Sequence, residues 1–194
     1  LIDINQIKLL AEQCDLIGNN KIAKVPITST QLEPDVNNTY LDRSLTLRKL
    51  YDIAVYDNVF WEHVTNQKIV SIISELLNTK DIKLYGDQLF MKPPGGVEKT
   101  SHQDSPYFPI SPMNLISCWI ALDDVNEENG CMKVLPGSHL WGKLPHTEKW
   151  MVGDREDMCI PQNRISKKNE VSIHLNAGSA SFHHSLLVHR SGLN

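Results

Sequence analysis

The sequence predicts a mainly β protein with α-helices packed on one side of the strands. Two observations lead to this fold class: apolar residues recur at helical spacing in the first part of the chain, and short apolar runs bounded by turn signals follow Asn78. Helices followed by short strands are typical of an antiparallel sandwich or barrel covered by helices. The length suits a single domain, 1–194, with a helical N-terminal part over about 1–79 and a β core over about 80–194.

The N-terminal part contains two helical regions separated by a loop. Residues 4–17 are predicted to form an amphipathic helix, because apolar residues recur there at helical spacing: Ile4, Ile7, Leu10, Ala11, Cys14 and Ile17. Residues 19–42 are polar and contain proline, which indicates a loop. A second helical zone is expected from about Leu45 to Leu77, with breaks at two plausible N-caps, Asp57-Asn58 and Thr65-Asn66.

Short apolar runs after Asn78 are predicted to be strands. They are Ile82 to Leu84 with Leu89 to Lys92, then Leu115 to Leu122, Cys131 to Leu135, Val171 to His174, and Ala180 to Val188. A long polar stretch from about Gly142 to Glu170 interrupts them. Loops of that length are often functional lids or disordered segments, so we expect it to be a lid and a source of substrate specificity.

Charge and cysteine content exclude several classes of protein. The formal net charge is −4, so no overall basic field would attract nucleic acid or an anionic membrane. No apolar run is long enough to span a bilayer. The cysteines, Cys14, Cys118, Cys131 and Cys159, form no CxxC motif and are expected to be free thiols. With no signal peptide in the first residues, we expect an intracellular protein, although the chain does not begin with Met and further targeting signals stay open.

Residues 101–104 read Ser-His-Gln-Asp and suit a metal site. On a strand, residues two apart point to the same face, so His102 and Asp104 can aim at one point. Non-haem Fe(II) oxygenases combine such a pair with a distant histidine and leave positions open for co-substrate and dioxygen. Two neutral imidazoles and one carboxylate leave Fe(II) with positive charge, which favours an anionic 2-oxo acid. Alone, the tripeptide is a weak signal, because chance supplies it often and a surface polar loop is the alternative.

Several motifs occur in a recognisable order around this pair. They are Lys92-Pro93-Pro94, Lys99-Thr100, His102-Gln103-Asp104, Tyr107-Phe108-Pro109, Cys118-Trp119, Glu128-Asn129-Gly130-Cys131, Leu135-Pro136-Gly137-Ser138-His139, and the segment Phe182 to Asn194. Over at least residues 82–194, and weakly back to Lys49, the chain resembles the phytanoyl-CoA hydroxylase (phytanoyl-CoA dioxygenase) family. The resemblance implies a double-stranded β-helix (a cupin-like jelly roll) for residues 80–194. It also implies Fe(II) and 2-oxoglutarate chemistry with O2.

Carried over by position, the resemblance makes His102 and Asp104 the first two iron ligands. It selects His189 as the third, because that histidine lies in the segment Leu-Leu-Val-His-Arg-Ser-Gly-Leu-Asn. His183 and His184 are the rivals. In a regular strand His183 shares a face with His189, whereas His184 faces the other way. His183 stands where the family pattern has an aromatic residue and is most simply a packed replacement, and His184 is expected near the site.

The resemblance also implies a 2-oxoglutarate pocket lined by Lys49, Gln88, Gln103 and Trp119, with Ser191 near the co-substrate carboxylate. For Lys49 the alternative is a solvated helix residue, and for Trp119 a core aromatic; Gln88 replaces an expected apolar residue. The family places an arginine about ten residues after the distal histidine, where it forks onto that carboxylate. The chain ends at Asn194, before that point, so we expect its C-terminal strands to be missing.

The other histidines show no ligand spacing. His63, His146 and His174 are expected at the surface or in packing, and His139 in a turn.

The sequence therefore predicts an Fe(II)- and 2-oxoglutarate-dependent dioxygenase that hydroxylates an unactivated C–H bond of a small metabolite or acyl-type substrate, with release of succinate and CO2. Halogenation is disfavoured because Asp104 occupies the position that chloride would need. Two alternatives stay open: a non-catalytic binding protein on the same scaffold, and a cupin-like metal enzyme that does not use 2-oxoglutarate. We expect a small-molecule substrate, no nucleic-acid or membrane partner, and a cytoplasmic location, or a peroxisomal one in a eukaryote. The oligomeric state is not readable.

Overall fold

The structure of the protein is a computed structural model that describes residues 1–33, 46–152 and 155–194. Its helices are α1 (Ile4–Gly18), α2 (Asn58–Val64) and α3 (Gln67–Leu77). Each begins after a side chain that accepts hydrogen bonds from backbone N–H groups of the first turn: Asp3, Asp57 and Asn66. The predicted first helix and both predicted caps of the second helical zone are confirmed.

The strands are short and pair antiparallel. They are β1 (Thr30–Leu32), β2 (Leu47–Tyr51), β3 (Gln88–Phe90), β4 (Lys99–His102), β5 (Ile116–Ile120), β6 (Met132–Val134), β7 (Glu148–Val152), β8 (Arg155–Cys159), β9 (Val171–Ser172), β10 (Ala180–His184) and β11 (His189–Ser191). Among the described residues they form four sheets with the orders β1-β2-β3, β10-β5, β4-β11-β6-β9 and β7-β8. Short 3-10 turns connect them, at Ile27–Ser29, Ile53–Val55, Ser105–Tyr107, Ser138–Trp141, Gln162–Arg164 and Lys167–Asn169.

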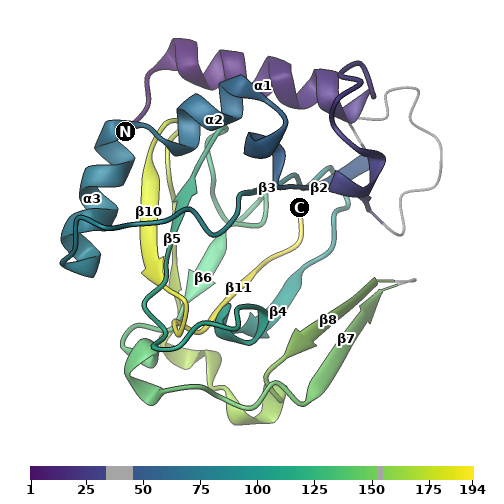
Figure 1. Ribbon diagram of the computed structural model, residues 1–194. Helices are drawn as coiled ribbons and strands as arrows, with labels where there is room; N and C mark the ends of the chain where they lie inside the picture. Colours follow the sequence, from purple (N-terminus) through teal and green to yellow (C-terminus); the bar gives the residue numbers. More distant parts are fainter. Residues whose placement is uncertain (34–45, 153–154) are drawn as a thin grey trace.

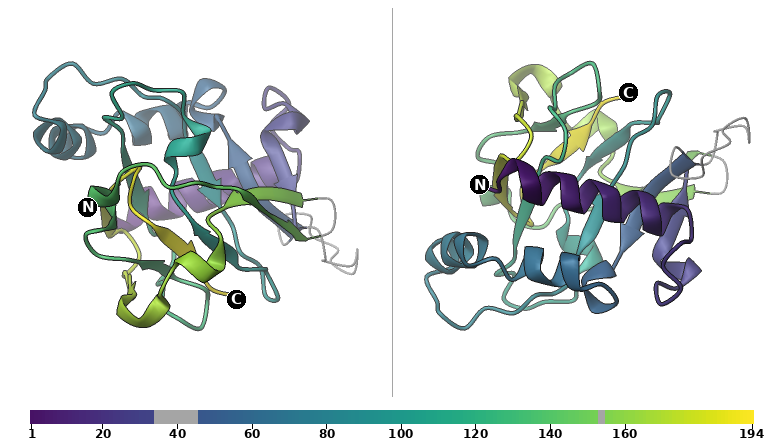
Figure 2. Two further views of the ribbon diagram at one scale, coloured as in Figure 1. Left: turned by 90° about the horizontal axis from the view of Figure 1, so that it is seen from below. Right: turned by 90° about the horizontal axis from the view of Figure 1, so that it is seen from above.

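Helix α3 lies beside β10 and β5, whereas the other two helices share one end of the strands (Figure 1). Helices α1 and α2 lie across that end, and the β7–β8 hairpin extends from the opposite end (Figure 1). Seen from above, α1 crosses the molecule in front of the sheets (Figure 2). The main hydrophobic core joins α1 and α2 to β2 and includes Leu10, Ile17, Leu47, Leu50 and Phe60. A second, smaller core is formed by Leu135, Ile160, Ile165 and Val188.

Strand β2 corrects the expected helical zone. The sequence predicts helix from about Leu45, but residues 47–51 are extended and hydrogen-bonded on both edges, to β1 and to β3. Leu47 and Leu50 have helical spacing, yet both are fully buried in the sheet, because the register with β1 is irregular at Leu32. Pairing to two strands outweighs the weak local preference for helix. Strand β1 likewise replaces part of the loop expected over 19–42, of which 34–42 lie outside the described residues.

The stretch expected to be a polar loop, Gly142 to Glu170, contains the β7–β8 hairpin. The polar composition of this stretch did not indicate strands. A two-stranded hairpin that is exposed to solvent carries charged residues, such as Glu148 and Lys149, in place of apolar ones. The hairpin is tied to the rest of the fold where the N–H of Ile160 donates to the carbonyl of Ser101, at 3.0 Å. The prediction of a loop is therefore wrong for β7 and β8, while the expected role of this stretch as a lid stays a prediction.

Two of the predicted strands are shorter or interrupted. Between Asn78 and Pro93 only Gln88–Phe90 is a strand, so the strand predicted from Ile82 to Leu84 is wrong. The single strand expected from Ala180 to Val188 ends at His184, and β11 begins at His189 after a turn. In that turn the N–H of Ser185 donates to the carbonyl of Leu115, at 3.0 Å. The chain thereby passes from the β10–β5 sheet to the β4–β11 sheet.

Two simpler expectations concern cysteines and helices. All four cysteines are free, as predicted, and three of them are buried. None of the helices in the described residues has the length and apolar content needed to cross a bilayer.

Candidate metal centre

The His-Gln-Asp motif lies at the end of β4. His102 is the last residue of that strand, and Asp104 follows in helical backbone conformation. The N–H of Asp104 donates to the carbonyl of Ser185, at 3.0 Å. This bond anchors the backbone of Asp104 to the turn between β10 and β11, and its carboxylate faces the ring of His102.

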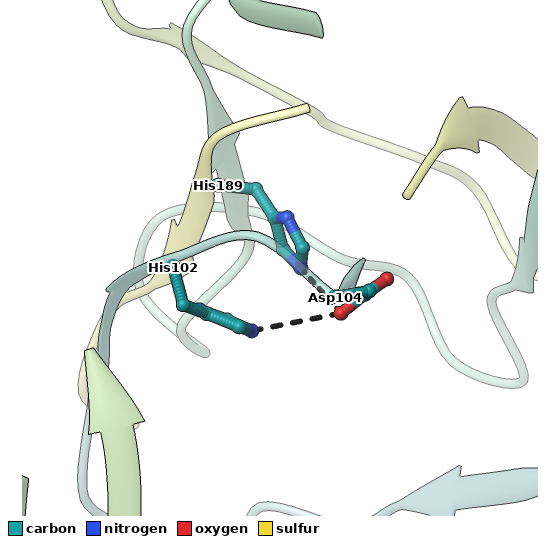
Figure 3. Close-up of side chains that lie close together, drawn as sticks. All are labelled: His102, Asp104 and His189. Carbon is teal, nitrogen blue, oxygen red and sulfur yellow. Dashed lines mark ion pairs between the residues drawn. The ribbon is translucent and has the colours of Figure 1, made fainter. Parts of the chain in front are cut away.

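His189 completes the group from another strand. It is the first residue of β11 and lies directly opposite His102 in the antiparallel register. The two rings are 4.3 Å apart between centroids. Nε2 of His189 lies 3.6 Å, and Nε2 of His102 3.8 Å, from Oδ1 of Asp104, so the three side chains point toward one another (Figure 3). One donor atom from each residue lies within 4.8 Å of the others.

Hydrogen bonds at the far side of each ring set the tautomer. Nδ1 of His102 lies 2.8 Å from the carbonyl oxygen of Thr100, and Nδ1 of His189 lies 3.0 Å from that of Leu187. A carbonyl oxygen only accepts, so each Nδ1 carries the proton and each Nε2 turns a lone pair toward Asp104. A ring nitrogen fixed in this way is the usual arrangement of a metal-binding histidine.

The electrostatics of the group match a metal-ligand set. Burial lowers the pKa of His102 well below its usual value and also lowers the pKa of His189. Burial alone would raise the pKa of Asp104, but attraction between its carboxylate and the rings of His189 and His102 in their protonated form, together with the polar contact from His183, outweighs burial and places that pKa well below its usual range. At neutral pH the group therefore offers two neutral nitrogens and one anionic oxygen. This donor set fits the two-histidine, one-carboxylate site of non-haem iron.

Two further side chains contact Asp104 from the β10–β5 sheet. Oγ of Ser117 donates to Oδ2 at 3.1 Å, and Nε2 of His183 lies 3.6 Å from the same oxygen. Sequence reasoning did not single out Ser117 and treated His183 as packing. The feature that identifies both residues as neighbours of Asp104 is the pairing of β5 with β10, which places them directly opposite each other. His183 and His189 do face one site, but from different strands. Nδ1 of His184 instead accepts from the N–H of Leu186, at 3.1 Å.

Gln103 is fully buried and links the motif to the segment after β6. Its side-chain amide donates to the carbonyls of Gly142 and Leu186, at 2.8 and 2.7 Å, and accepts from the N–H of Leu144, at 2.8 Å. Its backbone N–H donates to Nε2 of His146, at 2.8 Å. His146, which we expected at the surface or in packing, therefore contacts the motif directly.

Lys49 and Gln88 lie together on the β1-β2-β3 sheet. Nζ of Lys49 lies 4.6 Å from the ring centroids of both Tyr51 and Phe90, a distance at which the aromatic faces attract the ammonium group. Gln88 is exposed on β3 and pairs with Tyr51 of β2. The structure thus places Lys49 on a strand, where the alternative of a solvated helix residue does not apply.

Trp119 and Ser191 lie on strands that contribute to the metal centre. Trp119 is partly buried on β5, opposite Ser181 of β10. Ser191 lies two residues after His189 on β11, and its Oγ accepts a hydrogen bond from Nζ of Lys92, at 2.9 Å. The structure therefore brings an ammonium group to the residue that we expect near the co-substrate carboxylate.

Comparison with known proteins gives consistent matches. The family described as phytanoyl-CoA dioxygenase (PhyH) matches residues 30–194. "Phytanoyl-CoA dioxygenase, peroxisomal" of Homo sapiens is 34% identical over 144 residues, which cover 71% of this chain and 42% of the relative. "Probable phytanoyl-CoA dioxygenase" of Caenorhabditis elegans is 30% identical over 163 residues, which cover 80% of this chain and 52% of the relative. The chain thus spans about half the length of these relatives.

Solved structures of low sequence identity share the fold. EctD from S. alaskensis in its apoform superposes with a TM-score of 0.77 at 17% identity, covering 100% of this chain and 65% of that one. The non-heme alpha ketoglutarate dependent carbocyclase SnoK from nogalamycin biosynthesis superposes with a TM-score of 0.73 at 19% identity, covering 100% and 71%. The predicted cupin-like jelly roll is confirmed by these neighbours.

Proposed function

The chain belongs to the phytanoyl-CoA dioxygenase (PhyH) family, and from that premise we propose that the protein is an Fe(II)- and 2-oxoglutarate-dependent dioxygenase. Its reaction is the hydroxylation of an unactivated C–H bond in a small metabolite or acyl-type substrate. One oxygen atom of O2 enters the hydroxyl group and the other enters succinate, which forms with CO2 from 2-oxoglutarate. The observation that carries this proposal is the convergence of His102, Asp104 and His189, whose donor atoms lie within 4.8 Å of one another.

Each residue of the group has a defined task. His102 and His189 would hold the metal through Nε2, because their Nδ1 atoms are held by backbone carbonyls. Asp104 would supply the negative charge. When bound, Fe(II) supplies the redox chemistry that couples O2 to the oxidation of 2-oxoglutarate. The burial of His102 and His189 strengthens the electrostatic interactions within the site.

We assign the co-substrate pocket to Lys49, Gln88, Gln103, Trp119 and Ser191. Ser191 shares a face of β11 with His189 because the two are separated by one residue. With the ammonium group of Lys92 on its hydroxyl, Ser191 suits the binding of a carboxylate. Gln103 would form part of the wall, since its amide already bonds backbone groups on either side of the motif.

The substrate is proposed only as a class. The relatives named above carry phytanoyl-CoA in their names, whereas a relative from Stutzerimonas stutzeri is named "Probable alpha-ketoglutarate-dependent hypophosphite dioxygenase" and is 32% identical over 93 residues, covering 48% of this chain and 32% of that relative. Names of related proteins thus differ in substrate, and a shared fold does not fix it. An intracellular location, cytoplasmic or peroxisomal, is proposed on the same footing, since the human relative is named as peroxisomal.

Succinate formation from 2-oxoglutarate tests this function. We expect the protein to release succinate and CO2 when Fe(II), 2-oxoglutarate and O2 are all present, and Asp104→Ala to abolish the release. His174→Ala, which changes an exposed histidine, is the matched control and should retain it. Full activity of Asp104→Ala would contradict the ligand assignment. Metal-dependent turnover without 2-oxoglutarate would indicate the cupin-like metal enzyme. Binding of Fe(II) and 2-oxoglutarate without succinate release would indicate the non-catalytic binding protein.

A further inference from the structure

The oxygen of Asp104 that pairs with both histidine ligands is Oδ1. Oδ1 lies 3.8 Å from Nε2 of His102 and 3.6 Å from Nε2 of His189. Oδ2 accepts a hydrogen bond from Oγ of Ser117, at 3.1 Å, and lies 3.6 Å from Nε2 of His183. The two oxygens of this carboxylate therefore have separate sets of partners.

The partners of Oδ2 form one structural unit. Ser117 on β5 and His183 on β10 are directly opposite in the antiparallel register, so their side chains project from the same face of that sheet. The ligands His102 and His189 come from the other sheet, on β4 and β11. The carboxylate of Asp104 thus lies between the two sheets, with one oxygen toward each.

The surroundings of His183 favour a ring that donates a hydrogen bond to Oδ2 of Asp104. Its side chain is 7% exposed, and among the described residues its Nδ1 is a buried atom without a hydrogen-bond partner. With a carboxylate oxygen facing Nε2 and no acceptor at Nδ1, the geometry favours an N–H at Nε2. The 3.6 Å separation is longer than an ordinary N–H···O bond of roughly 2.7–3.2 Å, so the contact in this structure is an electrostatic one.

A buried imidazole with one unpartnered nitrogen is costly compared with an apolar ring of the same size. The contact of the other nitrogen, from Nε2 to Oδ2 of Asp104, is therefore the polar interaction that offsets this cost. His102 and His189 carry their protons on Nδ1 and turn lone pairs to the centre, whereas His183 turns an N–H toward it. The three rings around Asp104 are therefore not equivalent.

We infer that Ser117 and His183 are positioning residues that hold Oδ2 of Asp104 and leave Oδ1 as the single oxygen offered to the metal. This inference rests on the proposed function, because it takes His102, Asp104 and His189 as the metal site. A carboxylate that binds through one oxygen leaves open a coordination position that it would fill if it chelated. The family of chemistry proposed here needs such open positions for a chelating 2-oxo acid and for O2.

Metal binding tests this role without any turnover. Co(II) is titrated into the metal-free protein, and its ligand-field absorption reports affinity and coordination. We expect His183→Phe and Ser117→Ala each to weaken Co(II) binding about 10-fold or more, the range found for groups that orient metal ligands, and to change the spectrum. His183→Gln, which keeps an N–H near the position of Nε2, should bind within about 3-fold of the unmodified protein. His174→Phe, at an exposed histidine, should leave binding unchanged.

The tautomers provide a second measurement, on the metal-free protein. Long-range 1H–15N correlation spectra of protein labelled at histidine should show His183 protonated at Nε2, and His102 and His189 protonated at Nδ1. A His183 ring protonated at Nδ1 would overturn the inference and leave the proposed function standing. If His183→Phe does not fold, Ser117→Ala and His183→Gln are titrated with Co(II) in its place.

The outcomes separate the two levels of the proposal. Absence of Co(II) binding by the unmodified protein, or undiminished binding by Asp104→Ala, overturns the proposed function and this inference with it. Binding by the unmodified protein that His183→Phe leaves unchanged, with the same spectrum, overturns this inference alone. Weaker binding in His183→Phe that returns in His183→Gln supports both.

Discussion

Oε1 of Gln103 accepts a hydrogen bond from the backbone N–H of Leu144, at 2.8 Å. The residue between the first two metal ligands is thereby attached to the segment after β6. The same side chain donates to the carbonyls of Gly142 and Leu186. Gln103 thus holds the His-Gln-Asp motif in place with bonds that are all buried or partly buried, and its removal should be felt in both stability and metal binding.

We expect Gln103→Leu to lower the free energy of unfolding by roughly 2–4 kcal/mol, because leucine leaves three backbone groups without their partner. Urea denaturation measures the change. The matched control is Gln67→Leu at the exposed start of α3, where we expect a change within about 0.5 kcal/mol. Equal effects of the two substitutions would show that the bonds of Gln103 contribute little.

The residue after the distal ligand makes a forked ion pair. Nε of Arg190 donates to both carboxylate oxygens of Glu170, at 2.9 and 3.0 Å, and Nη2 donates to one of them, at 2.7 Å. We expect Arg190→Lys to cost about 1–2 kcal/mol of unfolding free energy, because an ammonium group does not reproduce the fork and the pair is largely buried. Thermal and urea denaturation measure the loss.

The control for Arg190 is an exposed pair on the β7–β8 hairpin. Lys149 and Glu156 are 2.9 Å apart, but their side chains are 69% and 47% exposed. Lys149→Gln should change the unfolding free energy by less than about 0.5 kcal/mol, as is usual for surface pairs. A loss at Lys149 as large as that at Arg190 would contradict the distinction drawn from burial.

Stability of the metal-free protein should fall as the pH falls below about 6.5. Burial lowers the folded-state pKa of His102 and His189 below the ordinary value of 6.5. In that range the unfolded chain binds protons that the folded chain does not, so each group costs up to about 1.4 kcal/mol per pH unit until its folded pKa is reached. Asp104 adds a loss of the same sign below about pH 4, where the unfolded carboxyl takes up a proton.

Urea denaturation in the presence of a chelator measures this dependence. The useful pH range runs from about 5 to about 7.5, where histidine side chains titrate. The pKa values of His63, His146 and His184 are also lowered by burial, so they add to the same slope. His102→Gln removes one of these titrating groups and should make the slope shallower. A stability that is constant over this range, or that rises as the pH falls, would show that these rings are not held neutral by burial.

Local sequence patterns predicted those elements whose signals lie within a few residues. The first helix, its neighbours' caps at Asp57 and Asn66, and strand β5 follow from spacing and capping chemistry. Strand β2 does not, because its partner β3 is distant in sequence. The β7–β8 hairpin is local, but its exposed, polar strands lack the apolar pattern by which strands are identified. Leu47 and Leu50, three apart and both buried in a sheet, show how a local spacing misleads when pairing on both edges decides the conformation.

The residues of the site likewise fall into those that the sequence predicts and those that only strand pairing brings together. His102 and Asp104 form a local motif, and family resemblance selected His189, so all three were predicted and the structure brings them together. Ser117 and His183 reach Asp104 only because β5 pairs with β10. That pairing is a long-range relationship which a single sequence does not display. The break between His184 and His189 was missed for the same reason, since a change of sheet leaves no periodic signal.

A crystal structure of the protein grown without oxygen, with Fe(II) and 2-oxoglutarate, tests the central claim most directly. Anomalous scattering at the iron edge locates the metal. We predict one iron within about 2.0–2.3 Å of Nε2 of His102, Nε2 of His189 and an oxygen of Asp104, with the 2-oxo acid bound to it. Iron outside this group, or 2-oxoglutarate bound away from the metal, would contradict the account.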